Sequence, residues 1–205
     1  MSSDSEIKKQ FGNIDIYIFD QLLKGQINPS HKILDAGCGK GRNLIYFLKN
    51  GYEVYAIDPS EDAIKQVKTL ATEHAPNLPL SNFTSSSIEN MPFGKNSFDR
   101  IICNAVLHFA QNKSHFEDML FFLWAILKDK GQLFIRTATS IGIEDSIEYL
   151  GNGRYHLPDG DERYLIDLDT MLHYTEKLNA KLTDPIKTTN VQNQRCMSTW
   201  CLEKL

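Results

Sequence analysis

The sequence predicts an α/β protein with a doubly wound, mostly parallel sheet of seven strands that ends in an antiparallel hairpin. Two observations favour this fold class. Between residues 32 and 138, short apolar runs alternate with stretches of helical periodicity, and after residue 180 the pattern changes to two strand-like runs around a polar middle. Because alternating strands and helices are joined by right-handed crossovers, helices are expected on both faces of a parallel, Rossmann-like sheet.

Five parallel strands and five helices are expected before the hairpin. The strands are short apolar runs, and the fourth is apolar almost throughout, which is typical of a strand buried on both faces. The expected strands are 32–36, 53–58, 81–86, 98–105 and 132–138. The expected helices are 15–23, 42–51, 59–74, 114–131 and 168–179.

Capping residues indicate where three of these helices begin or end. Ser60 is the expected N-cap of the third helix, and Ser114 with Glu117 has the spacing of a capping box for the fourth. Gly51 and Gly131 are the expected stops of the second and fourth helices, because glycine readily adopts the conformation that closes a helix.

The chain is expected to form one domain, residues 1–205, because its length and average composition suit a single core. Residues 1–30 form a helical extension in this interpretation. Residues 139–167 show little periodicity and are expected to be a long loop or a partly ordered cap. Long insertions in compact domains are usually functional, so this segment is the candidate lid.

Composition and charge exclude several function classes. The net charge is −4 with no long run of one sign, which argues against a nucleic-acid partner bound by charge. A polar start and the lack of a long apolar stretch predict a cytoplasmic protein with no membrane partner. The four cysteines form no C-x-x-C pair, so no metal site is expected.

A glycine loop follows the first expected strand in the stretch "ILDAGCGKGRN". Gly37, Gly39 and Gly41 stand where ligands bind in open α/β sheets, at the carboxyl end of a strand. The spacing G-x-G-x-G differs from the dinucleotide fingerprint G-x-G-x-x-G and from the Walker signature. Asp35, just before the loop, would repel a pyrophosphate and attract a cation.

These charges favour S-adenosylmethionine as the ligand, because it carries a sulfonium and an ammonium and no phosphate. Asp58 ends the second strand and is placed to accept hydrogen bonds from a ribose diol. Such an acid also occurs in nicotinamide-binding proteins, so an NAD-dependent oxidoreductase remains an alternative.

Four segments together resemble the motifs of the class I S-adenosylmethionine-dependent methyltransferases, in the same order and at similar spacing. They are "ILDAGCGKGRN", "VYAIDPSEDAI", "SSIENMPFGKNSFDRIICNAVLHF" and "LKDKGQLFIRTA". The stretch "GCGKGRNLIYFLKNGYEVYAID" is also similar to the small tellurite-resistance-type methyltransferases. The place after the fourth strand reads "NAVLHF" and lacks the motif of adenine-N6 DNA methyltransferases, which again argues against nucleic acid.

The resemblance implies a set of cofactor contacts. Asp35 would face the methionine amino group, Asp58 the ribose, and Pro59 the adenine. Ser87 stands where the family usually has an acid, so the Ile88 backbone N–H is the expected adenine contact. The full set implied is Asp35, Gly37, Cys38, Gly39, Asn43, Asp58, Pro59, Ser87, Ile88 and Asn104.

The expected reaction is an in-line displacement that transfers a methyl group to a small-molecule acceptor, and S-adenosyl-L-homocysteine is the product. Orientation of the reactants supplies much of the rate, and a poor nucleophile also needs a base. His108, just past the fourth strand, is the candidate base and substrate contact. Further candidate substrate contacts are Tyr17, Tyr155, Arg163 and Arg195.

Three alternatives to this function stay open. They are a protein or peptide side-chain methyltransferase, the oxidoreductase named above, and a module that binds S-adenosylmethionine without catalysis. The expected assembly is a monomer or a homodimer. The acceptor atom and the pathway are not given by the sequence.

Overall fold

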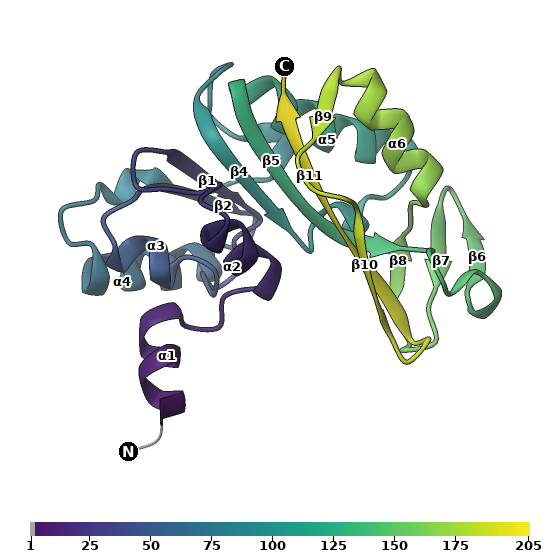
Figure 1. The fold of residues 1–205 in the computed structure, drawn as a ribbon, viewed down its shortest axis with the longest axis horizontal. Helices are drawn as coiled ribbons and strands as arrows, with labels where there is room; N and C mark the ends of the chain where they lie inside the picture. Colours follow the sequence, from purple (N-terminus) through teal and green to yellow (C-terminus); the bar gives the residue numbers. More distant parts are fainter. Residues whose placement is uncertain (1–2) are drawn as a thin grey trace.

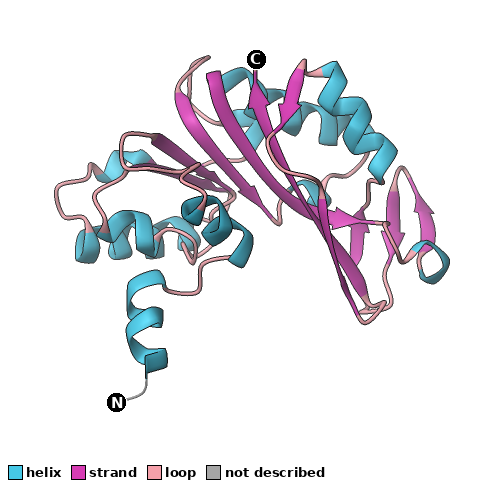
Figure 2. Ribbon diagram, in the orientation of Figure 1, coloured by secondary structure: helices cyan, strands magenta, loops and turns pink. Residues whose placement is uncertain are grey.

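The computed structural model describes residues 3–205 as a layered α/β fold with a second, smaller sheet (Figures 1 and 2). The strands of the main sheet are β1 Lys32–Ala36, β2 Glu53–Asp58, β3 Phe83–Ser85, β4 Phe98–Asn104, β5 Leu127–Thr139, β9 Ala180–Leu182, β10 Lys187–Val191 and β11 Arg195–Lys204. The helices are α1 Ser3–Phe11, α2 Ile16–Leu23, α3 Ile45–Lys49, α4 Glu61–His74, α5 Lys113–Ile126 and α6 Leu168–Lys177.

The main sheet has the order β10-β11-β5-β4-β1-β2-β3, and β9 also pairs with β11. Strands β1 to β5 run parallel, whereas β11 is antiparallel to β5 and β10 is antiparallel to β11. The predicted fold class is therefore confirmed, including the hairpin at one edge. The short strand β9 is one strand more than the sequence analysis expected.

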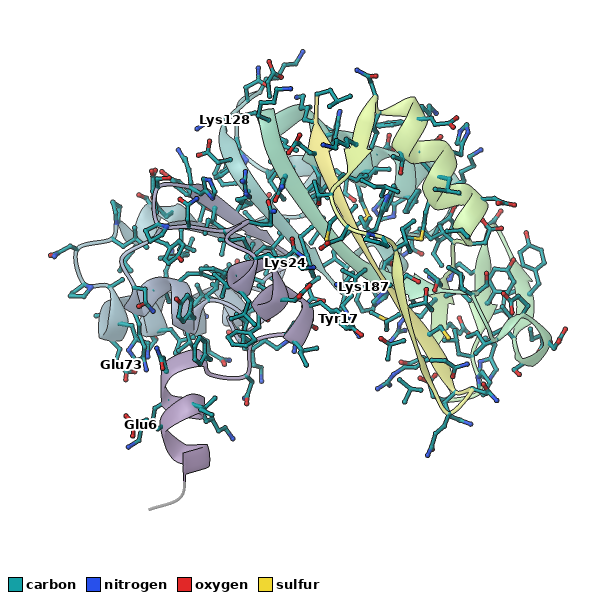
Figure 3. All side chains as sticks on the ribbon, in the orientation of Figure 1. Glu6, Tyr17, Lys24, Glu73, Lys128 and Lys187 are labelled. Atoms are coloured by element: carbon teal, nitrogen blue, oxygen red, sulfur yellow. The ribbon has the colours of Figure 1, made fainter. Side chains whose placement is uncertain are left out.

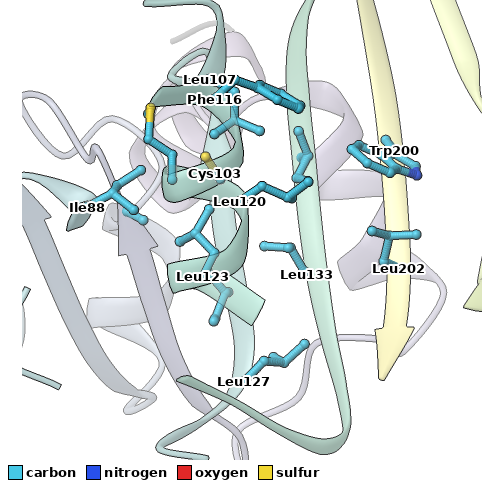
Figure 4. Packing of buried hydrophobic residues seen from close by; sticks show 14 of the residues in the cluster. Ile88, Cys103, Leu107, Phe116, Leu120, Leu123, Leu127, Leu133, Trp200 and Leu202 are labelled. Carbon is cyan, nitrogen blue, oxygen red and sulfur yellow. The ribbon is translucent and has the colours of Figure 1, made fainter. Parts of the chain in front are cut away.

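Helices cover both faces of the sheet. Successive residues of a strand point to opposite faces, so the apolar side chains on each face pack against helices. On β4, Ile101 and Cys103 pack in the cluster that contains α5, and Ile102 packs in the opposite cluster with α3 and α4. Figure 4 shows Leu120 and Leu123 of α5 against Leu133 of the sheet. Five aligned strands thus place their carboxyl ends at one edge, where the site lies.

The C-terminal strand β11 brings the largest fully buried side chain, Trp200, into the α5 and α6 cluster (Figure 4). Its indole Nε1–H donates a hydrogen bond to Thr175 Oγ1 at 3.0 Å. A buried indole N–H left without a partner would cost free energy, so this bond fixes α6 against β11.

Helix α2 is tied to the C-terminal hairpin by polar contacts, in the region where Figure 3 labels Tyr17, Lys24 and Lys187. Lys24 Nζ lies 2.9 Å from Asp184 Oδ1, and Lys187 Nζ lies 2.9 Å from Asp20 Oδ2. Such part-exposed ion pairs contribute little each. Together they fix the side of the molecule on which the N-terminal extension lies. Residues 1–2 of this extension are outside the described range.

Residues 139–167 are folded rather than a long loop. They form a three-stranded antiparallel sheet of β6 Glu148–Gly151, β7 Arg154–His156 and β8 Glu162–Tyr164. The Tyr164 ring stacks on Phe116 of α5 with centroids 5.4 Å apart, and Arg154 Nη1 donates to the Ala110 carbonyl at 3.2 Å. The small sheet is therefore attached to the region just after β4.

The ends of α5 differ from those expected. Asn112 is the N-cap, and its side-chain oxygen accepts a hydrogen bond from the His115 N–H at 2.9 Å, so the Ser114–Glu117 capping box is wrong. The helix ends at Ile126 instead of Gly131, because Leu127 is buried and pairs with Phe98 as the first residue of β5.

None of the helices in residues 3–205 combines the length and the apolar run that a bilayer crossing requires.

The cap of α5 gives a stability prediction. We expect Asn112→Ala to lower the free energy of unfolding by about 1 kcal/mol, since an N–H in the first turn of the helix loses its partner. Ser114→Ala, two residues away, is the matched control and should change it by less than about 0.5 kcal/mol. Urea denaturation measures both, and a larger loss for Ser114→Ala would contradict the assigned cap.

Candidate active site

A cavity of about 470 Å³, here called the first cavity, opens at the carboxyl ends of β1, β2, β3 and β4. It is lined by Gly37, Gly39, Asp58, Pro59, Ser86, Ser87, Ile88, Glu89, Ala105, Val106, Phe109, His115 and Met119. Six of the ten predicted cofactor residues are in this set: Gly37, Gly39, Asp58, Pro59, Ser87 and Ile88. The other four, Asp35, Cys38, Asn43 and Asn104, lie outside the lining.

The glycine loop leaves β1 in a backbone conformation that requires glycine. Gly37 has φ +78°, and a Cβ built there would lie 2.4 Å from Val106 Cγ2. The N–H groups of Gly37 and Cys38 both donate to the Ile57 carbonyl, at 2.8 and 2.9 Å. The loop is therefore folded back onto β2, and any side chain at position 37 would enter the space between the loop and β4.

Asp58, the last residue of β2, is held by backbone donors on both carboxylate oxygens. Oδ2 accepts from the Gly39 N–H at 2.8 Å, and Oδ1 accepts from the Ser60 N–H at 2.9 Å. Ser60 in turn caps α4, as predicted, by accepting from the Ala63 N–H. The Asp58 carboxylate is thus fixed at the wall of the first cavity, with lone pairs left over for a ligand hydroxyl.

Asp35 is buried beneath the loop, with 1% of its surface exposed, and neither carboxylate oxygen has a hydrogen-bond partner in residues 3–205. Burial raises the pKa of this carboxyl to about 7; Arg42 opposes the shift and Asp58 adds to it. A buried carboxylate without a partner is costly, so a cation that reached it would be bound strongly.

The three other predicted cofactor residues that do not line the first cavity are Asn43, Cys38 and Asn104. The Asn43 side-chain oxygen accepts from the Asp15 N–H at 3.0 Å and so holds the start of α2. Cys38 is buried in the α3 and α4 cluster. Asn104 is the last residue of β4, and its amide has no hydrogen-bond partner in residues 3–205.

Sequence reasoning missed Glu89 and His115, which both line the first cavity and contact each other. His115 Nε2 is bonded to Glu89 Oε1, and Nδ1 accepts from the Gln111 N–H at 3.2 Å. The sequence analysis used the second and third residues of the stretch "SSIENM", Ser87 and Ile88, but not the fourth, Glu89. His115 carries no sequence signal, because only the docking of α5 brings it to the cavity.

A second cavity of about 210 Å³ adjoins the first, and the two share Ala105. Its lining is Ala105, His108, Arg136, Ala138, Leu157, Asp159, Asp161, Arg163, Arg195 and Met197. Ala105 has φ +63°, a strained value for a residue with a Cβ, and such strain is concentrated at functional sites. The β7–β8 segment and the hairpin supply most of its wall.

Three predicted substrate residues, His108, Arg163 and Arg195, meet in the second cavity. Arg163 pairs with Asp161 at 2.6 Å, and Arg195 pairs with Asp159 at 3.4 Å. Each pair joins an arginine to an aspartate of the same cavity wall. Both positive charges are therefore already balanced within the cavity.

Tyr17 and Tyr155 are also predicted to contact substrate, but neither is among the residues that line the first or the second cavity. The Tyr17 hydroxyl is 2.5 Å from Thr189 Oγ1, and its ring lies 5.2 Å from the Arg136 guanidinium carbon. Tyr155 packs with Leu157 in the cluster beneath the small sheet. Both tyrosines therefore support the wall and do not face the cavity.

The base role predicted for His108 does not fit its hydrogen bonding. Nδ1 accepts from the Ala138 N–H at 3.1 Å, so the neutral ring carries its proton on Nε2. Burial, with the charges of Arg163 and Arg136, lowers the pKa of His108 to about 4. The ring is therefore neutral at pH 7 and donates at Nε2, where a base would have to accept.

Comparison with known proteins identifies the family. Residues 34–135 match the model of a methyltransferase domain. The chain is 30% identical over 82 residues to an uncharacterized methyltransferase of Synechocystis sp.. These 82 residues are 40% of this chain and 35% of that protein. It is 25% identical over 146 residues to an uncharacterized methyltransferase of Bacillus subtilis, 71% of this chain and 54% of that protein. The chain thus spans about a third and about half of the length of these two relatives.

Solved structures show the same fold. One is the Burkholderia thailandensis 1,6-didemethyltoxoflavin-N1-methyltransferase with bound 1,6-didemethyltoxoflavin and S-adenosylhomocysteine, with TM-score 0.69, 19% identity, and coverage of 98% of this chain and 86% of that one. Another is the [4+2]-cyclase SpnF, with TM-score 0.72, 12% identity, and coverage of 92% and 80%. This chain belongs to the class I S-adenosylmethionine-dependent methyltransferases. The family resemblance of its motifs is thereby confirmed.

The first cavity of this methyltransferase fits the cofactor of its family. An unpartnered buried carboxylate at Asp35 suits a cationic group, and the fixed Asp58 carboxylate suits a ribose diol. Ile88, Val106 and Met119 give the cavity apolar surface for an adenine ring. Among residues 3–205, no three His, Cys, Asp or Glu side chains are grouped to hold a metal ion.

Asp35 gives a pH prediction for the methyltransferase. Its pKa of about 7 lies above the ordinary 3.8, so ionising it costs the free protein stability as the pH rises between those values. A cofactor ammonium stabilises the ionised form. Affinity for S-adenosylhomocysteine should therefore rise about tenfold from about pH 6 to about pH 8, as the ionised fraction rises. Calorimetry across this range measures it.

The control for this prediction is Asp35→Asn, which keeps the side-chain size and removes the charge. It should bind S-adenosylhomocysteine more weakly at pH 8 and lose most of the pH dependence. A variant as steep as the wild type would place the titrating group elsewhere.

Asp58 gives an affinity prediction. We expect Asp58→Ala to weaken S-adenosylhomocysteine binding by about 1–3 kcal/mol, because the ribose hydroxyls and the Gly39 N–H lose their acceptor. Asp62→Ala, on the exposed first turn of α4, is the matched control and should leave the dissociation constant nearly unchanged. Equal affinities for both variants would remove Asp58 from the cofactor site.

Proposed function

We propose that this methyltransferase transfers the methyl group of S-adenosylmethionine to a small-molecule acceptor held in the second cavity. The observation that carries the proposal is the junction of the two cavities at Ala105. A cavity of about 210 Å³ suits a small molecule or one functional group of a larger one.

Residues of both cavities have separate tasks in this function. When bound, S-adenosylmethionine supplies a methyl group on a positively charged sulfur, which is open to displacement by a nucleophile in line with the bond. Asp35, on β1 before the glycine loop, and Asp58, at the end of β2, orient the cofactor. The walls of the second cavity orient the acceptor and exclude water, and orientation alone can supply several kcal/mol of the barrier, of the order of 7–11.

The second cavity holds no imidazole that is ready to accept a proton, since His108 carries its proton on Nε2. A nucleophile that is already deprotonated, or that has a free lone pair, needs no such base. This favours an acceptor atom of that kind over an unactivated aliphatic hydroxyl.

The neighbouring proteins support a small acceptor without identifying one. The 1,6-didemethyltoxoflavin-N1-methyltransferase was solved with 1,6-didemethyltoxoflavin bound, and the [4+2]-cyclase SpnF carries the fold under the name of a different reaction. The fold is therefore compatible with small molecules, and the chemistry has to be tested on this chain.

The test uses S-adenosylmethionine labelled in its methyl group. The methyltransferase is incubated with a small-molecule extract and, separately, with the protein fraction of the same cells. We expect label in products below the size of a peptide. Label in the protein fraction alone would support a side-chain methyltransferase, and tight cofactor binding with label in neither fraction would support a binding module without catalysis.

A further inference from the structure

The charges of the second cavity are unevenly paired. Arg163 and Arg195 each face an aspartate of the same wall, Asp161 and Asp159, and these four side chains balance one another. Arg136 is the third arginine of the lining and has no aspartate within the cavity. Among the lining arginines, Arg136 is therefore the one whose nearest carboxylate, Asp15, lies outside the cavity.

Arg136 makes no side-chain hydrogen bond with any group in residues 3–205. Its Nε is buried without a partner, and only 17% of the side chain is exposed. The nearest carboxylate oxygen, Asp15 Oδ2, is 3.7 Å from Nη1, and Arg42 Nη2 approaches the same oxygen at 3.5 Å. A guanidinium has five N–H donors in a fixed plane, so leaving them unpaired in a half-buried site is unfavourable.

His108 adds a second donor to the same cavity. The ring is 5% exposed, and its Nδ1 is taken by the Ala138 N–H. No group in residues 3–205 accepts a hydrogen bond from Nε2–H. The two groups without protein partners are thus both donors, and a ligand that satisfies them must offer acceptors.

Position links these donors to the reaction. Arg136 lies on β5 beside Asn104 of β4, and its carbonyl accepts from the Ala105 N–H at 2.7 Å. Ala105 is the residue shared by the two cavities. A group bound by Arg136 is therefore next to the junction where an acceptor atom would meet the methyl group.

We propose that the methyl acceptor carries an anionic oxygen group, such as a carboxylate or a phosphate, and that Arg136 and His108 bind this group in the second cavity; this inference rests on the proposed function. A planar guanidinium and a carboxylate form two parallel hydrogen bonds, and the same geometry serves a phosphate. The neutral ring of His108 donates a third. Arg163 and Arg195 line the same cavity and are each paired with an aspartate of it.

Probe binding tests the charge directly. Ligand-observed NMR with the protein saturated by S-adenosylhomocysteine compares benzoate, its neutral isostere benzamide, and inorganic phosphate. We expect benzoate to bind at least about tenfold more tightly than benzamide, because charge-assisted bonds to a guanidinium are the stronger ones. If phosphate binds more tightly than benzoate, the oxyanion is a phosphate; the reverse indicates a carboxylate. Equal binding of benzoate and benzamide, with no binding of phosphate, overturns the inference.

Variants test the residue. Arg136→Gln should weaken benzoate binding about tenfold or more. Arg42→Gln is the matched control, because it removes the other arginine beside Asp15 without touching the second cavity, and it should stay within about twofold of the wild type. Retained S-adenosylhomocysteine binding shows that each variant is folded. If Arg136→Gln does not fold, the wild-type comparison of benzoate with benzamide still decides, and equal loss in both variants contradicts the assignment.

A third experiment separates this inference from the proposed function. The small-molecule extract is divided on an anion-exchange resin before it is incubated with the labelled methyl donor. Label that enters the anionic fraction supports both proposals. Label confined to neutral or cationic small molecules overturns the anionic acceptor and leaves the small-molecule function intact. Label found only in protein overturns the proposed function itself.

Discussion

The turn that joins β1 to the glycine loop is the constraint on which the site depends. The carbonyl of Ile57 and the carboxylate of Asp58, consecutive residues at the end of β2, accept three N–H groups of this loop. A positive φ at Gly37 makes this possible, and Val106 fills the space that a side chain there would need. The strand end, the loop and the residue after β4 are thereby fixed relative to one another before any ligand binds, which is what precise binding requires.

Among the buried side-chain groups of residues 3–205 that lack a hydrogen-bond partner, two are ionisable, and their charges have opposite signs. The Asp35 carboxylate is buried under the first cavity, and the Arg136 guanidinium lines the second. Each costs stability in the free protein, since a buried polar group without a partner keeps its desolvation penalty. Backbone strain and buried polar groups without hydrogen-bond partners are typical of binding sites, where a ligand supplies the missing partner. The two side chains indicate where oppositely charged ligand groups are expected: a cationic group at the glycine loop and an anionic group beyond Ala105.

Local signals in the sequence were sufficient for the parallel half of the fold and for the loop. Hydrophobic periodicity predicted β1 to β5, and Ser60 is both the predicted and the observed cap of α4. The ends of α5 were predicted less reliably. Asn112 and Ser114 both suit an N-cap, so the sequence did not separate them. The strand pairing of Leu127 ends the helix earlier than expected. The Asn152–Gly153 pair, a strong hairpin signal, marks the turn between β6 and β7 inside the segment that the sequence analysis expected to be a long loop or a partly ordered cap. The tautomer of His108 and the approach of His115 to Glu89 depend on contacts distant in sequence, so no local pattern could give them.

The two cavities are built from different parts of the chain, and this decides how far the relatives inform function. Every residue that lines the first cavity lies within 34–135, the segment that matches the methyltransferase domain. Eight of the ten residues that line the second cavity lie after it, on β5, the small sheet and β11. In the proposed function, cofactor binding therefore depends on the shared segment, and acceptor choice depends mainly on residues outside it. Arg136 is the first residue beyond the shared segment, at the boundary between the two functions. Because Arg136 Nε is buried without a hydrogen-bond partner in residues 3–205, the proposed acceptor would be selected by electrostatics as well as by shape.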